Sequence, residues 1–411
     1  MITVTEISEC FPNKLKPVTG DFILQHSRAL AKYCKVIVIV PLRLVPAKEI
    51  FSINPFKLFS NLKKWFGALI KTKNFSEGNM RIIYFKYISL PRPYFESHDV
   101  SFINFFFYGR LKKILESLSP DIIYCNWLRP WSELLSKAAE ELNIPFVIDH
   151  HEDIPTLKKL FPEYYKNFLK AFEKAEKIIV HSSVNKNDLI NEKLKLNEIK
   201  TIYYGQNFSV NEKQKVFNYG NLKLVCVSHL YEPRKSIDIL IRAVDKIKSE
   251  LDPPRRIELK IVGDGILKDN YVKLSESLQL NECVKFTGSL SQKEVEEILE
   301  ESDIFILPSY PEAFGIVYIE ALAKGLPVIT CKGNGGGEEL KLLDYPVMLV
   351  TPGSHDELAD EILNLVKNKN KLFEMSDKGK ETVKNYFTWE KNAKNTINFL
   401  EKSIKEFNPD N

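Results

Sequence analysis

The stretch DIFILPSYPEAFGIVYIEALAKGLPVIT, residues 303–330, has the pattern of a strand, a turn, a helix and a second strand. Two short apolar runs, DIFIL and LPVIT, bracket a segment in which apolar residues recur at helical spacing. Parallel strands need a long crossover connection, and a helix is the usual one. This stretch therefore predicts one strand-helix-strand step of an α/β fold.

The same alternation runs through the rest of the chain. A polar segment, residues 209–221, separates two series of strands and helices. The sequence predicts two Rossmann-like domains, each a doubly wound parallel sheet, over residues 1–210 and 211–388. The other strand-like runs are KVIVIV (35–40), DIIYC (121–125), IPFVID (144–149), KIIVHS (177–182), KTIYY (200–204), LKLVCVS (222–228), IELKIVG (257–263) and VKFTG (284–288).

Length and composition narrow the function classes. The 411 residues favour two domains, and a net charge of +4 is too small to indicate nucleic-acid binding. The six cysteines form no CxxC pair, which favours buried free thiols in a reducing compartment. The chain starts with the strand-like MITVTEIS and has no apolar run of the roughly 18 residues that a spanning helix needs. We expect a cytoplasmic protein, with peripheral contact to a membrane surface.

Open parallel sheets bind ligands beyond the carboxyl ends of their strands. After IELKIV, the tripeptide Gly263-Asp264-Gly265 would let backbone N–H groups approach a ligand, although a plain turn is the commoner cause of such a tripeptide. After LKLVCVS, the basic residues Arg234 and Lys235 either bind phosphate oxygens or form a solvated turn.

Two glutamates bracket the start of the helix predicted after DIFILPS. Glu312 precedes the helix N-terminus, where an acid can be an ordinary cap. Glu320 lies among the apolar residues of IVYIEALA, so its carboxylate needs hydrogen-bond donors, and the paired hydroxyls of a ribose would supply them. After LPVIT, the three glycines 335–337 either wrap a ligand closely or form a flexible loop. Together these positions suit a nucleoside diphosphate attached to a hydroxyl-rich group.

Several of these motifs are similar to those of the group 1 (family 4) retaining glycosyltransferases of the GT-B fold. The second half carries SHLYEPRKSIDILI, VGDG, VKFTGSLSQKEV, LPSYPEAFGIVYIEALAKGLPVI and GGGEEL. In the first half, FPNKLKPVTGDFILQHSRALAK (11–32) and FVIDHHEDI (146–154) resemble the family's N-terminal loop with its first helix and its strand-end histidine segment. The resemblance covers the chain almost end to end and implies two domains facing a central cleft.

For the second domain, the resemblance implies a donor site. It puts Glu312 at the hydroxyls of the donor sugar, near the reacting carbon, Glu320 at the ribose and Lys235 on the diphosphate. The expected donor is a UDP- or GDP-linked sugar, with no metal ion and no other cofactor. The further residues expected to bind it are His229, Arg234, Gly263, Asp264, Gly265, Ala313, Phe314, Gly315 and Ile316.

For the first domain, the resemblance implies the acceptor site. It puts His150 near the reaction centre with Asp153 in the same segment, and Gly20 in the loop that borders donor and acceptor. The final helix, 389–407, should cross back onto this domain. Closure of the domains would exclude water from the activated sugar.

One residue departs from the family pattern. Where the family has Gly-Arg-Leu, this chain has Ser228-His229-Leu230. A neutral imidazole offers one donor and no charge, whereas arginine offers five donors and a fixed charge. Either leaving-group stabilisation is weaker, or Arg234 supplies the charge instead.

Residues 46–75 interleave lysines with aromatic residues. Such a segment either rests on an anionic bilayer or packs its aromatics into the domain and solvates its lysines. A lipid-linked acceptor would suit the first alternative. The residues are Lys48, Lys57, Lys63, Lys64, Lys71 and Lys73, with Phe51, Phe56, Phe59, Trp65, Phe66 and Phe75.

The sequence thus predicts a metal-independent retaining glycosyltransferase that moves a sugar from a nucleotide donor to a hydroxyl of a glycan or lipid-linked glycan. Two alternatives stay open. One is a nucleotide-sugar epimerase, because a fold does not fix a function. The other is a catalytically weak sugar-nucleotide-binding protein, which the histidine at position 229 suggests.

Overall fold

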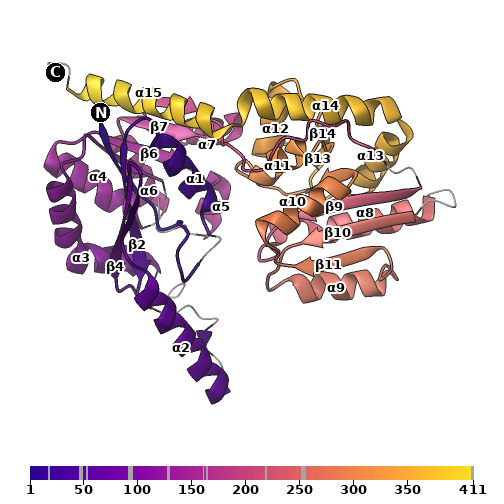
Figure 1. The fold of residues 1–411 in the computed structure, drawn as a ribbon, viewed down its shortest axis with the longest axis horizontal. Helices are drawn as coiled ribbons and strands as arrows, with labels where there is room; N and C mark the ends of the chain where they lie inside the picture. Colours follow the sequence, from indigo (N-terminus) through magenta and orange to yellow (C-terminus); the bar gives the residue numbers. More distant parts are fainter. Residues whose placement is uncertain are drawn as a thin grey trace. The chain divides into compact units, whose positions relative to one another are not determined.

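The computed structural model describes residues 1–16, 19–45, 50–51, 54–90, 96–126, 130–160, 162, 165–217, 220–250 and 256–408. The chain divides into two compact units. The first consists of Met1–His181, Lys186–Gly205 and the C-terminal segment from Trp389, and the second of Ser182–Asn185 and Gln206–Thr388. Figure 1 traces the chain through both units, and the last helix belongs to the first.

The first unit is built on an eight-stranded sheet with the order β3-β4-β2-β1-β5-β6-β7-β8. The central strand β1 pairs in parallel with β2 and β5, while β3 is antiparallel to β4 at one edge. The strands are β1 (Thr3–Ile7), β2 (Lys35–Arg43), β3 (Phe75–Glu77), β4 (Met80–Tyr87), β5 (Ile122–Cys125), β6 (Phe146–His150), β7 (Lys177–Val180) and β8 (Glu198–Thr201).

Helices cover this sheet, and a core lies on each of its faces. Successive side chains of a strand point to opposite faces, so Ile7 of β1 enters one core and Val4 enters the other. Leu400 of the last helix packs into the same core as Val4. The helices are α1 (Asp21–Leu30), α2 (Pro55–Lys71), α3 (Glu96–Leu118), α4 (Trp131–Leu142), α5 (Ile154–Leu160), α6 (Tyr165–Lys174), α7 (Ser183–Asn191), whose first residues group with the second unit, and α15 (Trp389–Phe407).

The second unit is built on a six-stranded parallel sheet with the order β11-β10-β9-β12-β13-β14. The chain winds outward from β9 in one direction and from β12 in the other, so the switch in winding falls between these two strands. The strands are β9 (Asn221–Val227), β10 (Arg256–Val262), β11 (Val284–Gly288), β12 (Ile304–Ile306), β13 (Val328–Cys331) and β14 (Met348–Val350).

Most helices of the second unit connect these strands, whereas α13 and α14 follow the last strand, β14. A short 3-10 turn, η2, follows β9, and α11 joins β12 to β13 as the quoted stretch predicts. The elements are η2 (Pro233–Lys235), α8 (Ile237–Glu250), α9 (Lys268–Ser277), α10 (Gln292–Glu301), α11 (Ile316–Ala323), α12 (Gly335–Leu342), α13 (His355–Lys367) and α14 (Lys369–Tyr386).

The predicted parallel α/β sheets are confirmed, with three strands that the sequence reading missed, namely β3, β4 and β14. The polar segment 209–221 is not only a linker, because described residues of it form hydrogen bonds with the rest of the second unit. The N–H of Asn211 donates to the carbonyl of Ala323 over 2.9 Å, and Nζ of Lys215 donates to the carbonyl of Glu300 over 2.6 Å. Among the described residues, no helix is long and apolar enough to cross a membrane.

Candidate active site

The donor-side candidates meet beyond the carboxyl ends of β9 and β12, where the winding of the second sheet switches. Lys235 and Glu312 form an ion pair between the ammonium group and Oε2 of the carboxylate. Nη1 of Arg234 lies 3.2 Å from the same oxygen, and the hydroxyl of Ser309 donates to it over 2.9 Å. Glu312 is therefore the centre of a cluster to which both loops contribute.

Hydrogen bonds to backbone carbonyls hold these two loops together. The N–H of Tyr310 donates to the carbonyl of Arg234 over 2.9 Å, and Nη1 of Arg234 donates to the carbonyl of Pro311 over 2.9 Å. Ser236, with φ of 53°, ends the 3-10 turn in the left-handed region. These bonds thus hold the loop with Arg234 and Lys235, which follows β9, against the loop with Glu312, which follows β12.

The electrostatics of this cluster keep Glu312 ionised. Burial alone would raise the pKa of Glu312, but the charges of Lys235 and then Arg234, with hydrogen bonds from Lys235 and Ser309, lower it to about 2. Glu312 is not the helix cap, because α11 begins at Ile316 and Gly315, at φ 86°, occupies the cap position. The ordinary capping interpretation of this acid is wrong.

The glycines 335–337 do not form a flexible loop. They form the first turn of α12, and a Cβ on Gly335 would lie 2.0 Å from the carbonyl oxygen of Ala313. On Gly336 it would lie 2.0 Å from the carbonyl oxygen of Phe314. These glycines allow the helix to lie against the segment after Glu312 and so fix its position.

The turn at Gly263-Asp264-Gly265 also packs against its own chain. A Cβ on Gly263, whose φ is 134°, would lie 1.9 Å from the carbonyl oxygen of Ser228. The N–H of Leu230 donates to the carbonyl of Asp264 over 2.9 Å. Close packing of two loops is sufficient to explain both glycines, and Asp264 itself is exposed.

The other donor-side candidates lie around the same strand ends. His229 is exposed, and partial loss of water together with the charge of Lys235 lowers its pKa below the ordinary value. Ala313 and Phe314 are buried. Glu320 is half-buried, one turn into α11 from Ile316.

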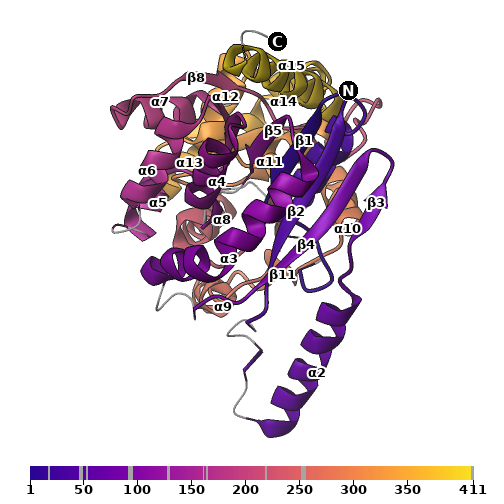
Figure 2. The ribbon, with the colours of Figure 1, turned by 90° about the vertical axis from the view of Figure 1, so that its left-hand side faces the viewer.

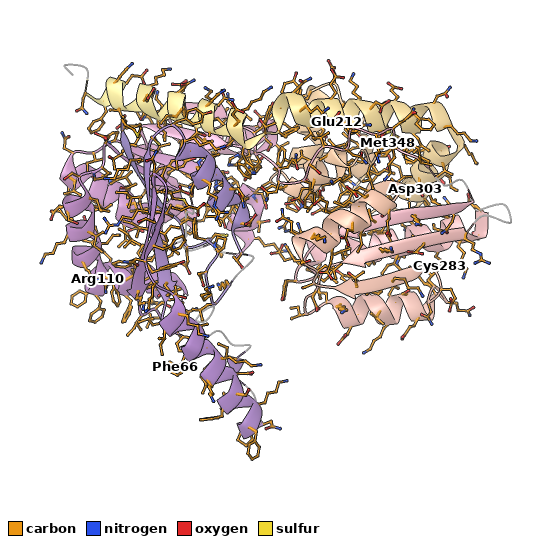
Figure 3. All side chains as sticks on the ribbon, viewed as in Figure 1. Phe66, Arg110, Glu212, Cys283, Asp303 and Met348 are labelled. Carbon is orange, nitrogen blue, oxygen red and sulfur yellow. The ribbon has the colours of Figure 1, made fainter. Side chains whose placement is uncertain are left out.

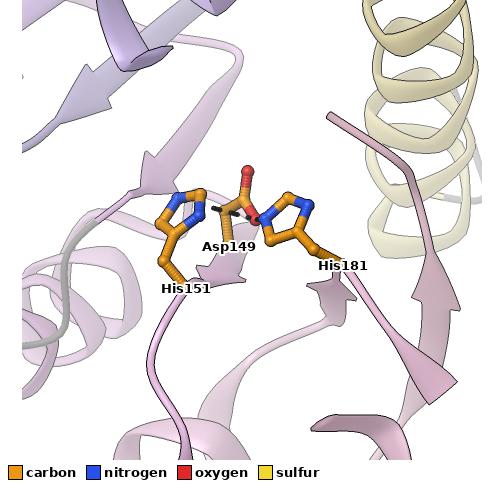
Figure 4. Close-up of side chains that lie close together, drawn as sticks. All are labelled: Asp149, His151 and His181. Atoms are coloured by element: carbon orange, nitrogen blue, oxygen red, sulfur yellow. Dashed lines mark ion pairs between the residues drawn. The ribbon is translucent and has the colours of Figure 1, made fainter. Parts of the chain in front are cut away.

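The first unit contains a buried polar cluster that the sequence reading passed over. Oδ1 of Asp149, at the end of β6, lies 2.7 Å from Nε2 of His181 and 3.8 Å from Nε2 of His151. The two imidazole rings stack with centroids 4.6 Å apart. Figure 4 shows the carboxylate of Asp149 between the two rings.

Further hydrogen bonds orient these rings. Nδ1 of His181 lies 2.8 Å from the carbonyl oxygen of Ile202, which can only accept, so this nitrogen carries a proton. Nδ1 of His151 lies 2.7 Å from the hydroxyl of Tyr204. The rings line a small pocket, whose described lining is Phe22, Ile23, His26, Asn126, Asp149, His151, His181, Tyr204, Trp389 and Asn392.

Protonation in this pocket follows from burial and charge. Burial alone would raise the pKa of Asp149, but the neighbouring His151 and His181 rings outweigh it and hold the pKa below its ordinary value. Burial lowers the pKa of His151 to about 3, so its ring is neutral near pH 7. Behind the lining residue Asn126, which donates to Glu6, burial raises the pKa of that glutamate to about 8.

The ligand atoms of Asp149, His151 and His181 lie within 4.8 Å of one another, a donor set that also suits a transition metal. Tetrahedral ligands at 2.0–2.1 Å from a metal are separated from each other by about 3.3 Å. The 2.7 Å contact between Oδ1 of Asp149 and Nε2 of His181 is shorter than this separation. We therefore describe the three side chains as a close polar cluster.

The structure does not bring the predicted acceptor-side residues into this pocket. The ring of His150 is fully buried and meets Phe172 edge to face, with centroids 5.2 Å apart. Oδ1 of Asp153 accepts from the N–H of Thr156 over 2.7 Å, which caps α5. Gly20, with φ of 76°, begins α1 in a turn where a Cβ would lie 2.2 Å from the carbonyl oxygen of Cys10.

A signal in the sequence could have shown that His150 and His151 face opposite sides of the sheet. Side chains alternate along a strand, so residues 149 and 151 share a face from which residue 150 is excluded. Because Asp149 cannot enter an apolar core unpaired, His151 belongs on the polar face with it. His181 follows β7 at the same edge of the sheet.

Comparison with known proteins agrees with these features. Two doubly wound, mainly parallel sheets, with an acid and base cluster at the switch in the second, are the architecture of the GT-B fold. The model of "Glycosyltransferase Family 4" matches residues 22–209, and that of "Glycosyl transferases group 1" matches residues 209–382. The chain belongs to the group 1 glycosyltransferases.

Individual relatives support this assignment. An uncharacterized glycosyltransferase of Methanocaldococcus jannaschii is 30% identical over 68% of this chain and 75% of its own. A GDP-mannose-dependent alpha-(1-6)-phosphatidylinositol monomannoside mannosyltransferase of Mycobacterium tuberculosis is 31% identical over 43% of this chain and 46% of its own. The crystal structure of Anabaena HepE in complex with UDP has a TM-score of 0.70 at 20% identity, covering 98% of this chain and 100% of that one. The last likeness concerns the fold.

Proposed function

We propose that this glycosyltransferase moves a sugar, with retention of anomeric configuration and without a metal ion, from a UDP- or GDP-linked donor to a hydroxyl acceptor. The acceptor is a glycan or a lipid-linked glycan. The observation that carries the proposal is the cluster around Glu312, in which one ionised acid is held by two cations at the switch point of the second sheet. The names of two similar proteins, which mention GDP-mannose and UDP, support the donor class.

In this proposal the cations of Lys235 and Arg234 bind the donor diphosphate. An ammonium group has three donors and a guanidinium has five, so each can keep its bond to Glu312 and still bind a phosphate oxygen. The charge that develops on the leaving diphosphate would then be stabilised by fixed cations, which is the role a metal ion has in other enzymes. Glu312, ionised at neutral pH, accepts hydrogen bonds from hydroxyls of the sugar, and Glu320 accepts those of the ribose.

We assign the acceptor to the first unit and the reaction-centre histidine to His151 instead of His150. The ring of His151 lines the polar pocket, whereas the ring of His150 packs against Phe172. Asp149 orients the two rings of the pocket through its contacts with His151 and His181. A neutral His151 can accept or donate a hydrogen bond to a hydroxyl of the substrate.

We also propose peripheral association with the cytoplasmic face of a membrane through α2. None of the residues 55–71 is buried, and Phe56, Phe59 and Phe66 are 85%, 72% and 53% exposed. Phe56, Phe59 and Phe66 therefore do not pack into the domain, whereas Trp65 of the same helix is half-buried. The helix projects from the sheet of the first unit in Figure 2, and Figure 3 labels Phe66 on it.

Charge on α2 favours an anionic bilayer. Lys57, Lys63, Lys64 and Lys71 are all exposed on it, Lys73 is exposed just after it, and Lys48 lies outside the described residues. A basic segment with exposed phenylalanines binds lipid by burying apolar area and by attraction to anionic head groups. The helix itself is well formed, because Pro55 occupies its first turn and Asn54 caps it by accepting from the N–H groups of Phe56 and Lys57.

A donor screen tests the transfer proposal. Thermal unfolding of the purified chain is followed with UDP- and GDP-sugars, and the donor that stabilises it is incubated with candidate acceptors in the presence and absence of EDTA. We expect an α-configured donor to give an α-linked product by NMR, with the same rate in EDTA. A product of inverted configuration would contradict retention. Loss of activity in EDTA would contradict metal independence. Conversion of the donor without any acceptor would instead identify an epimerase.

A vesicle assay tests the membrane proposal separately. We expect the chain to sediment with vesicles of phosphatidylglycerol but not with those of phosphatidylcholine, and to lose this binding when the exposed lysines of α2 become serine. Serine at four lysines exposed on the second unit, Lys248, Lys273, Lys285 and Lys293, provides the matched control. Equal sedimentation of both sets of variants would rule α2 out as the contact.

A further inference from the structure

A second, larger pocket lies beyond the carboxyl ends of β1 and β2 in the first unit. Its volume of about 480 Å³ is within the range of small-ligand sites. Two cations and one carboxylate lie in its wall, so the described lining is net positive. The lining consists of Glu9, Asn13, Leu15, Lys16, Pro41, Leu42, Arg43, Val45, Ile50 and Trp65.

The carboxylate of this pocket is fixed by the core. Oε2 of Glu9 accepts hydrogen bonds from the hydroxyl of Tyr87 and from Nε1 of Trp131, each over 3.2 Å. Tyr87 and Trp131 are both fully enclosed, so they hold the carboxylate in one place. A carboxylate can accept about four hydrogen bonds, which is why Glu9 can still bind hydroxyl groups of a ligand. A fixed acceptor of this kind suits the hydroxyls of a sugar ring.

The cations supply a second element of recognition. Arg43, the last residue of β2, donates from Nη2 to the carbonyl of Leu90 over 2.9 Å and from Nε to the hydroxyl of Ser89. These bonds orient the half-buried guanidinium, which has five donors in all. Lys16 adds an exposed ammonium group from the opposite loop. Together the two side chains suit an anionic group on the same ligand.

The walls of the pocket are formed by an ordered loop and by α2. Oδ1 of Asn13 accepts from the N–H groups of Leu15 and Lys16 over 2.8 and 3.1 Å, which fixes the loop that carries the ammonium group. Trp65 contributes an aromatic wall from α2, the helix that exposes Phe56, Phe59 and Phe66. One helix thus carries both the surface proposed to meet the bilayer and a wall of this pocket.

We propose that this pocket binds the acceptor, and that the acceptor is a hydroxylated ring carrying a phosphate or carboxylate group, presented at the surface of the membrane. Glu9 binds ring hydroxyls, Lys16 and Arg43 bind the anion, and Trp65 packs against the apolar face of the ring. This inference rests on the proposed function, since it names the substrate class of the first unit.

Three soluble probes test the inference without any donor. Glucose 1-phosphate and glucuronic acid carry a ring and an anion, and glucose carries the ring alone. We expect both anionic probes to bind the full-length chain at least tenfold more tightly than glucose, measured by titration calorimetry or ligand-observed NMR. The phosphate and carboxylate probes distinguish the two sources of negative charge. Equal binding of all three probes would overturn the proposal.

Variants then locate the binding. Lys16→Gln should remove most of the preference for the anionic probes, whereas Lys14→Gln, at an exposed position in the same loop outside the described lining, should preserve it. Glu9→Gln should weaken binding of all three probes at least fivefold. Unchanged affinities in Lys16→Gln and Glu9→Gln would refute the site.

A donor-site variant separates this result from the proposed function. Lys235→Ala should leave binding of the three probes unchanged, because Lys235 belongs to the second unit. If Lys235→Ala abolishes probe binding, the probes occupy the donor site and the inference fails while the transfer proposal stands. If the probes bind as expected but no donor supports transfer, the proposed function fails and the pocket remains a binding site.

Discussion

The ammonium group of Lys235 forms an ion pair with the carboxylate of Glu312, and their side chains are only 8% and 11% exposed. Charges this well enclosed interact strongly, and a buried pair that loses one partner leaves the other uncompensated. Here Arg234 and Ser309 also contact Glu312, so the acid keeps partners when Lys235 is removed. The cluster can therefore be tested by single substitutions.

We expect Lys235→Ala and Glu312→Ala each to lower kcat/KM for transfer by at least about 100-fold, the loss that follows from removing one fixed group at a developing charge. Both variants should keep the circular dichroism spectrum of the wild type. Lys273→Ala, at an exposed position of the same unit, should be fully active. Wild-type activity in either cluster variant would show that the cluster is not the donor site.

The depressed pKa of Glu312 predicts an acid-dependent loss of stability. Because the folded state holds this pKa near 2 and the unfolded state near 4.5, the ionised group stabilises the fold above pH 4.5 and this contribution disappears as the pH falls toward 2. The full shift corresponds to a free energy on the order of 3 kcal/mol. Urea unfolding of the wild type and of Glu312→Gln should therefore differ most at pH 6 and converge near pH 2. A difference that is constant from pH 6 to pH 3 would contradict the assignment.

His229 should make donor binding pH-dependent. Desolvation and the charge of Lys235 hold its pKa below the ordinary value, so the ring is neutral at pH 7.5 and gains a positive charge only in more acidic solution. We expect the donor that stabilises the chain to bind several-fold more tightly at pH 5.5 than at pH 7.5. Arginine at this position should bind tightly at both values.

The matched control for this substitution is His355→Arg, at a half-buried histidine of the same unit. It should leave the pH dependence of donor affinity as it is in the wild type. Calorimetric titration at the two pH values measures the effect. If the wild type is nearly inactive and His229→Arg transfers the sugar efficiently, the wild-type chain is a catalytically weak sugar-nucleotide-binding protein.

The close contact between α12 and the segment after Glu312 predicts a large effect of one added methyl group. Gly335→Ala puts a Cβ 2.0 Å from the carbonyl oxygen of Ala313, so helix and loop must separate. We expect a loss of about 1–3 kcal/mol in the free energy of unfolding and a weaker donor affinity. Gly109→Ala, where a Cβ meets no atom within 4 Å, should be neutral or stabilising. Equal stabilities for the two variants would contradict the packing.

The sequence by itself determined the two α/β domains and directed attention to Lys235 and Glu312. Period-two and period-3.6 patterns are local, so runs such as KVIVIV and IELKIVG indicate strands without knowledge of their neighbours. The rule that ligands bind beyond the carboxyl ends of parallel strands then directs attention to the segments that follow them. Lys235 and Glu312 were predicted in this way, although they lie 77 residues apart in the chain.

Only the tertiary structure decided which groups meet. Three features depend on segments that are distant in sequence. They are the distance between Asp149 and His181, the burial of His150, and the fit of glycines 335–337 against the segment after Glu312. The pocket between Glu9 and Trp65 likewise needs the end of β1 and a helix that begins at Pro55, far along the chain. Local patterns encode which face a side chain takes, but the free energy of a buried polar group depends on the partner that packing brings to it.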